Sequence, residues 1–186
     1  MKETIVFRDD AHDNLIKMQV HTVDIGGRTW MADDLAMCDG TIVDRVKIMT
    51  HTDFFYTWDA AVWMSDHIVG WHLPTPEEWD DMVRSFGYEE IGKLSPEYRS
   101  YEGIGKLIDG AGFRYDRPGG LIDDKGNWNH DYPSIITQPL YFWTSKLHDD
   151  GRAYYRTFNT EKETSGGYYI NWNYKMFVRL VKDLPA

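Results

Sequence analysis

The chain has 186 residues, the length of one domain or at most two. Acidic residues outnumber basic ones by 30 to 20, giving a net charge of −10 with no basic block. Nucleic-acid backbones and anionic membranes attract clustered Lys and Arg, so we expect neither as a partner. Aromatic residues make up 15 % of the chain, which argues against disorder because they supply the apolar burial that offsets chain entropy.

The sequence has no apolar segment typical of membrane insertion or secretion. Its longest clear apolar run covers residues 60–64, whereas a membrane-spanning helix needs ~20 residues. The opening stretch MKETIVFRDD lacks the apolar core of a signal peptide. The single cysteine, Cys38, excludes an intrachain disulfide and a Cys-based zinc site. No base stands beside it, so we interpret Cys38 as a small buried residue rather than a nucleophile.

The first third of the chain predicts β structure followed by a helix. Apolar and polar residues alternate over residues 16–21, the pattern of a half-buried strand. Gly26-Gly27 marks a hairpin turn before a short apolar stretch at 29–31. Thr57 is a candidate cap for a helix that has apolar residues at 58, 61 and 62. Glycines and prolines are scattered, so we predict a single domain spanning residues 1–186.

A second helix has the strongest local signals in the chain. Thr75 is a natural N-cap, Pro76 stands at the first helical position, and Glu78 completes a capping box. Gly87 provides the stop. One apolar stripe follows the helical period between cap and stop, and it consists of Trp79, Met82, Val83 and Phe86. This stripe predicts a buried helix face.

Residues 88–140 predict mostly loop, because 110–131 is dense in Gly, Asp, Asn and Pro. Four aromatic residues could hold this loop against the core, namely Phe113, Tyr115, Trp128 and Tyr132. Four β-rich runs then follow, at 141–143, 153–159, 168–174 and 176–182. Strands at both ends with helices between them indicate an α+β fold.

Six sequence motifs occur in order along the chain. They are GRTWMADDL (27–35), YTWDAA (56–61), GWHLPT with EW (70–79), GFR with GG (112–120), FWTS (142–145) and VRLVKD (178–183). This series resembles the Fibrobacter succinogenes major paralogous domain, a bacterial family with a C-type-lectin-like fold. The resemblance runs from about residue 7 to residue 183.

The resemblance implies a C-type-lectin-like α+β fold with antiparallel sheets, paired termini, two flanking helices and long loops. It also implies that distal loops and C-terminal strands display a binding surface. The formylglycine-generating enzymes and the variable proteins of diversity-generating retroelements look like members of the same fold superfamily. Variable proteins of this kind, found on phage and bacterial surfaces, diversify C-terminal strand residues, chiefly at codons for Asn, Tyr and similar types.

The chain departs from this family at two cysteine positions. His67 and Leu180 stand where family members often carry Cys. If these two cysteines form a disulfide in other family members, a chain that matures in a reducing compartment would be expected to lose both together. With no visible signal peptide, this favours a cytoplasmically made product such as a virion component. If the sequence is a piece of a longer secreted protein, cell-surface localisation remains the alternative, and phage or bacterial origin stays open.

Catalysis and cofactors are not indicated. Formylglycine-generating enzymes use paired cysteines, and this chain has one. No spacing singles out a carboxylate pair for glycoside hydrolysis, and the seven His form no zinc motif. We interpret His72 as a hydrogen-bonded structural residue, and we expect no enzyme activity, no cofactor and no metal. Calcium stays open, because Trp128-Asn129-His130 echoes half of a lectin calcium motif and three carboxylates lie nearby, on Asp123, Asp124 and Asp131.

The remaining candidate is a binding surface near the C-terminus. Tyr gives rigid contact area and Asn gives adaptable hydrogen bonds. The predicted ligand-binding residues alternate along two runs and are Tyr155, Thr157 and Asn159, then Tyr169, Asn171 and Asn173, with Tyr174. We expect Asn171 and Asn173 to be exposed, but Ile170 and Trp172 to be packed.

The predicted function is a non-catalytic recognition module that binds a protein or glycan on a cell surface. A retroelement-diversified receptor-binding protein is its more specific form. The alternative is a structural or adaptor domain of a virion or surface assembly, in which the chain forms a homo-oligomer or joins a larger complex.

Overall fold

The computed structural model describes residues 1–9, 14–51, 53–88, 90–95, 98–102, 120–129, 139–159 and 164–185. These residues form two α-helices, two five-stranded sheets and two two-stranded sheets. All ladders between the named strands are antiparallel. The sheet-rich α+β architecture predicted from the sequence is therefore present.

The first sheet carries both ends of the chain. Its order is β1 (Lys2–Asp9), β2 (Asn14–Ile25), β3 (Arg28–Met31), β14 (Val181–Lys182) and β6 (Trp71–His72). The predicted turn joins β2 to β3, and it needs glycine because Gly26 and Gly27 have φ of 60° and 79°.

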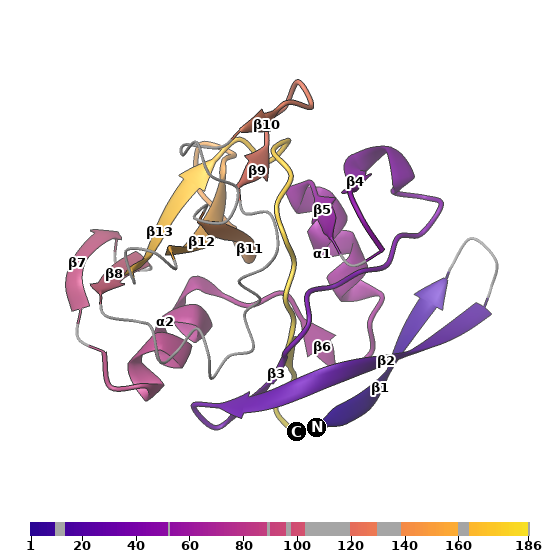
Figure 1. Cartoon of the computed structure of the whole chain (residues 1–186), viewed down its shortest axis with the longest axis horizontal. Helices are drawn as coiled ribbons and strands as arrows, with labels where there is room; N and C mark the ends of the chain where they lie inside the picture. Colours follow the sequence, from indigo (N-terminus) through magenta and orange to yellow (C-terminus); the bar gives the residue numbers. More distant parts are fainter. Residues whose placement is uncertain are drawn as a thin grey trace.

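The two termini lie next to each other at the edge of the molecule marked N and C (Figure 1). Their pairing is not a direct strand ladder, because β2 and β3 stand between β1 and β14 in the shared sheet. An ion pair joins them instead, with Lys182 Nζ 2.5 Å from Glu3 Oε2. The short β14 has β3 on one side and β6 on the other, so neither of its edges is open to β1.

The second sheet lies away from the termini (Figure 1). Its order is β11 (Leu140–Leu147), β12 (Ala153–Asn159), β13 (Thr164–Ile170), β8 (Tyr98–Glu102) and β7 (Glu90–Ser95). The predicted bounds of β12 are confirmed. The loop predicted over 88–140 is wrong at its start, because β7 and β8 form a hairpin there and β8 extends the sheet beside β13.

The strand predicted at 168–174 lies earlier in the chain. β13 begins at Thr164 and runs through Gly166 and Gly167, which face Thr157 and Arg156 of β12. Glycine has low strand propensity, so the residues at the start of β13 do not show the pattern of a strand in the sequence. Pairing with β12 and β8 supplies the backbone hydrogen bonds that hold it extended.

Two small sheets complete the fold and connect to the C-terminal segment. They are β4 (Val46–Ile48) with β5 (Phe54–Tyr56), and β9 (Leu121–Ile122) with β10 (Trp128–Asn129). A 3-10 turn, Val43–Arg45, precedes β4. Trp128 contacts Phe55 with ring centroids 5.3 Å apart, as its predicted anchoring role requires. The other three predicted loop anchors, at 113, 115 and 132, lie outside the described residues.

Both helices lie where they were predicted, but only α2 has the predicted side-chain cap. α1 (Trp58–Asp66) begins after Thr57, whose side chain makes no cap bond and donates to the Asp59 carboxylate instead. α2 (Pro76–Ser85) has the complete capping box: Glu78 N donates to Thr75 Oγ1, and Thr75 N donates to Glu78. Gly87 follows α2 with φ of 82°.

α2 buries its stripe between the two large sheets. Trp79 is fully buried and packs on Trp30 of β3 and on Phe142 and Phe158 of the second sheet. On the same helix, the Asp80 carboxylate accepts from the buried Arg156 guanidinium of β12. The helix thus fixes the second sheet against the first.

Cys38 is half-buried, and its thiol donates to the Asp39 carbonyl oxygen at 3.4 Å. Burial and the nearby Asp39 charge both raise the pKa of this thiol, which keeps it protonated. This environment is that of a packed residue and not of an activated nucleophile.

Candidate binding face

The strand register places the predicted binding residues on two different faces. In the β12–β13 ladder Tyr155 lies opposite Tyr168, whereas Tyr169 lies opposite Tyr154. Residues opposite each other share a face, so Tyr155 and Tyr169 point to opposite sides of the sheet. The single patch expected from these two runs is not formed.

Tyr155 belongs to a row of tyrosines that crosses three strands. Its ring centroid lies 5.7 Å from that of Tyr141 and 6.1 Å from that of Tyr168. Tyr155 is half-buried and Tyr168 is 48 % exposed. Further along β12, Thr157 Oγ1 donates to Gly166 O and Asn159 is only 7 % exposed. The accessible end of this row is therefore Tyr168.

Tyr169 lies on the other face, against the hairpin turn between β11 and β12. Its ring stacks on His148 with centroids 4.3 Å apart, and the Arg152 guanidinium lies 4.1 Å from its centroid. The Asp150 carboxylate accepts from Arg152 Nε at 2.7 Å, and its Oδ1 lies 2.8 Å from His148 Nδ1. The hydrogen bonds from Arg152 lower the pKa of the Asp150 carboxyl, so this turn keeps its ion pair.

β13 ends at Ile170, and the next three residues form a turn. Asn171 Oδ1 accepts from Asn173 N at 3.0 Å, and Asn171 O accepts from Tyr174 N at 3.1 Å. Both asparagines are exposed, as predicted. The prediction for Trp172 is wrong, because this side chain is 40 % exposed. Strand alternation no longer governs it once the chain leaves the sheet.

Tyr174 and Ile170 are half-buried against the main apolar core, which confirms the packed position expected for Ile170. Just beyond them, Lys175 exchanges backbone hydrogen bonds with Ile122 of β9 at 2.8 and 3.0 Å. β9 and β10 lie at the end of the molecule opposite the termini (Figure 1). The turn after β13 therefore lies at this far end.

We call the surface around the end of β13 the distal face. It is defined as residues 147–152, residues 168–174 and the helix start Trp58-Asp59. It contains a hollow of about 240 Å³. Five residues line the hollow, namely Trp58, Asp59, Leu147, Gly151 and Trp172. The sequence predicts Trp58 on the apolar face of a helix, and no local signal links it to Trp172.

Two hydrogen bonds fix the geometry of this hollow. Trp58 Nε1 donates to Thr144 O at 2.8 Å, which holds the indole ring in place. Trp58 N donates to Trp172 O at 3.0 Å, which attaches the turn after β13 to the start of α1. These bonds hold two of the five lining residues, Trp58 and Trp172, in relation to each other and to β11.

Asp59 contributes a negative charge to the hollow, and this charge is paired with Arg45. Its carboxylate accepts from Thr57 Oγ1 and, at 2.6 Å, from Arg45 Nη1. Burial by itself would raise the pKa of Asp59, but these hydrogen bonds outweigh it and lower the pKa below its usual value. Asp59 therefore stays ionised beside Arg45, and one third of its side chain is exposed.

The calcium site left open by the sequence finds no support in this part of the structure. Asp123 accepts from Lys125 N, Asn127 N and Asn127 Nδ2, so its oxygens organise their own turn. Across the described ranges, no three His, Cys, Asp or Glu side chains cluster closely enough to hold a metal ion. Asp131 lies outside the described residues.

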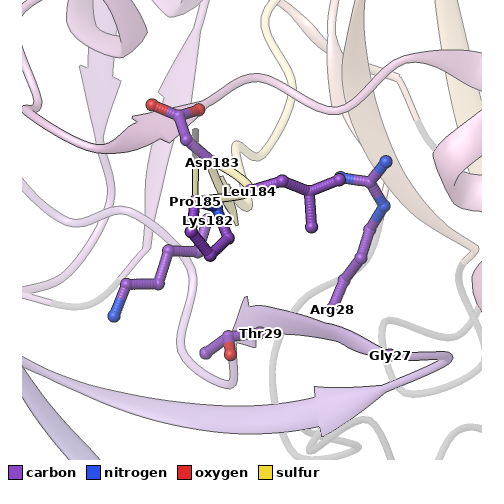
Figure 2. Close-up of a pocket in the computed structure, with 7 residues that line it drawn as sticks. All are labelled: Gly27, Arg28, Thr29, Lys182, Asp183, Leu184 and Pro185. Carbon is purple, nitrogen blue, oxygen red and sulfur yellow. The ribbon is translucent and has the colours of Figure 1, made fainter.

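A second hollow, of about 410 Å³, lies beside the termini. Its lining residues are Gly27, Arg28, Thr29, Lys182, Asp183, Leu184 and Pro185. Figure 2 shows the Arg28 guanidinium and the Lys182 ammonium pointing to opposite sides of it. Arg28 lies 2.9 Å from Glu78, while Lys182 lies 2.5 Å from Glu3. These cations do not converge on a common ligand position.

His72 connects three elements next to this second hollow. Its Nδ1 lies 2.6 Å from Asp183 Oδ1, and its Nε2 lies 3.0 Å from Glu78 Oε1. The hydrogen bond to Glu78 raises the pKa of His72, burial opposes it, and the contact with Asp183 raises it further. The structural role predicted for His72 is confirmed by this network.

We predict a pH-dependent stability carried by His72. A histidine whose pKa is raised on folding stabilises the folded state fully below its unfolded pKa of about 6.5, and this contribution is lost as pH rises through the folded value. The free energy of unfolding should therefore fall from pH ~6.5 upward in the native chain, and more gently in His72→Gln. Urea titrations at several pH values measure both slopes, and equal slopes would contradict the prediction.

None of the helices within the described ranges is long and apolar enough to cross a membrane. Comparison with known proteins found no matching protein-family model, no matching curated protein and no matching solved structure.

Proposed function

We propose that the chain is a non-catalytic recognition module that binds a protein or glycan on a cell surface through the distal face. The observation that carries the proposal is the exposed Trp172 in a pinned turn between exposed Asn171 and Asn173. Large aromatic groups on protein surfaces concentrate at binding sites, because leaving them in water forgoes the free energy of burial.

Hydrogen bonds and stacked rings order the distal face, which favours binding. Backbone hydrogen bonds hold Trp172 to α1 and Lys175 to β9, and the Asn171 side chain closes the turn between them. Arg152 and His148 stack on Tyr169 and order the neighbouring hairpin. A surface ordered in advance loses less conformational entropy when it binds.

The proposal includes a C-type-lectin-like fold. In its support, motifs from opposite ends of the chain meet: Arg179 of VRLVKD donates to Asp34 of WMADDL at 2.8 Å. His72 of GWHLPT likewise contacts Asp183 of the last motif. The adjacent termini and the distal turns at the far end also agree with this fold (Figure 1).

The retroelement-diversified form of the proposal makes a claim about the gene. The exposed members of the Asn- and Tyr-rich segment, Tyr168, Asn171 and Asn173, would be positions of diversification. A near-identical template repeat that differs at adenines should then lie near the coding sequence. Genomic sequence without such a repeat would remove this form and leave the recognition module.

The test is binding of fluorescently labelled protein to a glycan microarray and to intact Gram-negative and Gram-positive cells. The triple variant Tyr168→Ala, Trp172→Ala, Asn173→Ala should lose at least tenfold in affinity, because it removes exposed contact groups and keeps the turn-forming Asn171. The matched control Leu15→Ala, Val69→Ala, Leu184→Ala removes exposed apolar groups outside the distal face. Equal loss in both variants would contradict the proposal.

The same experiment separates recognition from a structural role. A structural or adaptor domain should show a stable oligomer by size-exclusion chromatography with light scattering and no binding to either probe. That result would favour the assembly role and overturn the recognition module.

A further inference from the structure

We infer that the hollow between Trp58 and Trp172 is a calcium-independent subsite for one uncharged sugar ring. This inference rests on the proposed function, because it names the ligand class of the distal face. It starts from the combination of two indole rings and an ionised carboxylate around one small depression.

The size of the hollow limits the ligand to a small group. Its volume of about 240 Å³ is below the ~300–1,000 Å³ of pockets that hold drug-sized ligands. One ring therefore fits better than an extended peptide. Leu147 and Trp172 are 44 % and 40 % exposed, so burying them under a ligand would remove apolar surface from water.

The lining chemistry matches the two sides of a pyranose. The C–H face of a sugar is apolar and packs on an indole ring, while its edge carries hydroxyl donors. Trp58 lines the hollow and has its only polar side-chain atom engaged with Thr144, so its side chain offers a ligand apolar ring surface. The Asp59 carboxylate is partly exposed and acceptor-only, as a hydroxyl donor requires.

The charges favour an uncharged ligand. Arg45 already pairs with Asp59 at 2.6 Å, so a cationic ligand would compete with a bound guanidinium. An anionic ligand would meet the Asp59 carboxylate within a chain of net charge −10. A neutral polyol meets neither obstacle, because the Asp59 carboxylate has about four lone-pair sites, of which Thr57, Arg45 and the Ala60 backbone N–H use three.

The experiment follows the indole N–H signals of the ¹⁵N-labelled protein during titration with sugars. The probes are the methyl glycosides of glucose, galactose, mannose and N-acetylglucosamine, each with EDTA present, and choline serves as the cationic comparison. The Trp172 signal is assigned by its loss in Trp172→Phe. We expect saturable shifts of the Trp58 and Trp172 signals with at least one glycoside at roughly millimolar affinity, as one small ring allows.

Trp172→Ala should lower the affinity for the glycoside at least tenfold, as measured from the shift of the Trp58 signal. Trp172→Phe should keep part of this affinity. Val69→Ala is the control, an exposed apolar residue outside both the lining and the distal face, and should leave the affinity unchanged. Three results would overturn the inference: no shift with any glycoside, a stronger response to choline, or an unchanged titration in Trp172→Ala.

Failure of this inference is distinguishable from failure of the proposed function. If labelled protein binds cells, loses binding in the triple variant and shows no sugar-induced indole shift, the sugar subsite is wrong and recognition through the distal face stands. If sugars shift the indole signals but cell and array binding survive the triple variant, the subsite stands and the distal face is not the recognition surface.

Discussion

Asp34→Ala should destabilise the protein by about 3–5 kcal/mol, because it removes the carboxylate paired with a buried arginine. Arg179 Nη2 and Nε lie 2.8 and 3.1 Å from Asp34 Oδ1, and each side chain is 2 % exposed. Burial lowers the pKa of Arg179 to about 9, the direction expected for a cation removed from water. Urea denaturation at pH 7 measures the loss.

A double substitution tests whether the cost comes from the uncompensated charge. Arg179→Met combined with Asp34→Ala removes both members of the pair, so it should be less destabilised than the sum of the two single variants. A cost below about 1 kcal/mol for Asp34→Ala would show that the pair does not fasten the chain ends. Additive losses would show the same.

Trp79→Ala should have a similar cost, about 3–5 kcal/mol, because it leaves a large cavity where the two sheets meet α2. The Trp79 ring centroid lies 4.9 Å from that of Trp30, 5.4 Å from Phe142 and 5.5 Å from Phe158. All four rings are fully buried. The same denaturation series measures this loss.

Two variants on α2 serve as controls for Trp79→Ala. Trp79→Phe keeps an aromatic ring and should lose less stability than Trp79→Ala. Asp81→Ala removes an exposed ion pair with Arg84 and should change stability by no more than about 0.5–1 kcal/mol. A Trp79→Ala variant as stable as Asp81→Ala would contradict the packing that we describe.

The parts of the fold that could be predicted are those encoded locally. The Thr75 cap, Pro76 and the apolar stripe of α2 all lie within residues 75–86, so local signals alone predict where this helix lies. The Gly26-Gly27 turn is equally local. By contrast, β13 runs through two glycines and depends on β12 and β8 for its hydrogen bonds, so its bounds could not be read from its own residues.

The candidate site was predicted in composition but not in geometry. The exposure of Asn171 and Asn173 follows from the poor strand propensity of asparagine and was predicted. The side to which Tyr155 and Tyr169 point depends on the pairing register, and a shift of one residue reverses it. Trp58 meets Trp172 only through the fold, since long stretches of chain separate them.

Recognition through the distal face is the central claim, and flow cytometry with intact cells tests it most directly. Labelled native protein should stain cells that carry its ligand, and the Leu15, Val69 and Leu184 control variant should stain them equally. The Tyr168, Trp172 and Asn173 variant, with an unchanged unfolding transition, should need at least a tenfold higher concentration for the same staining. Equal staining by all three proteins would contradict the account.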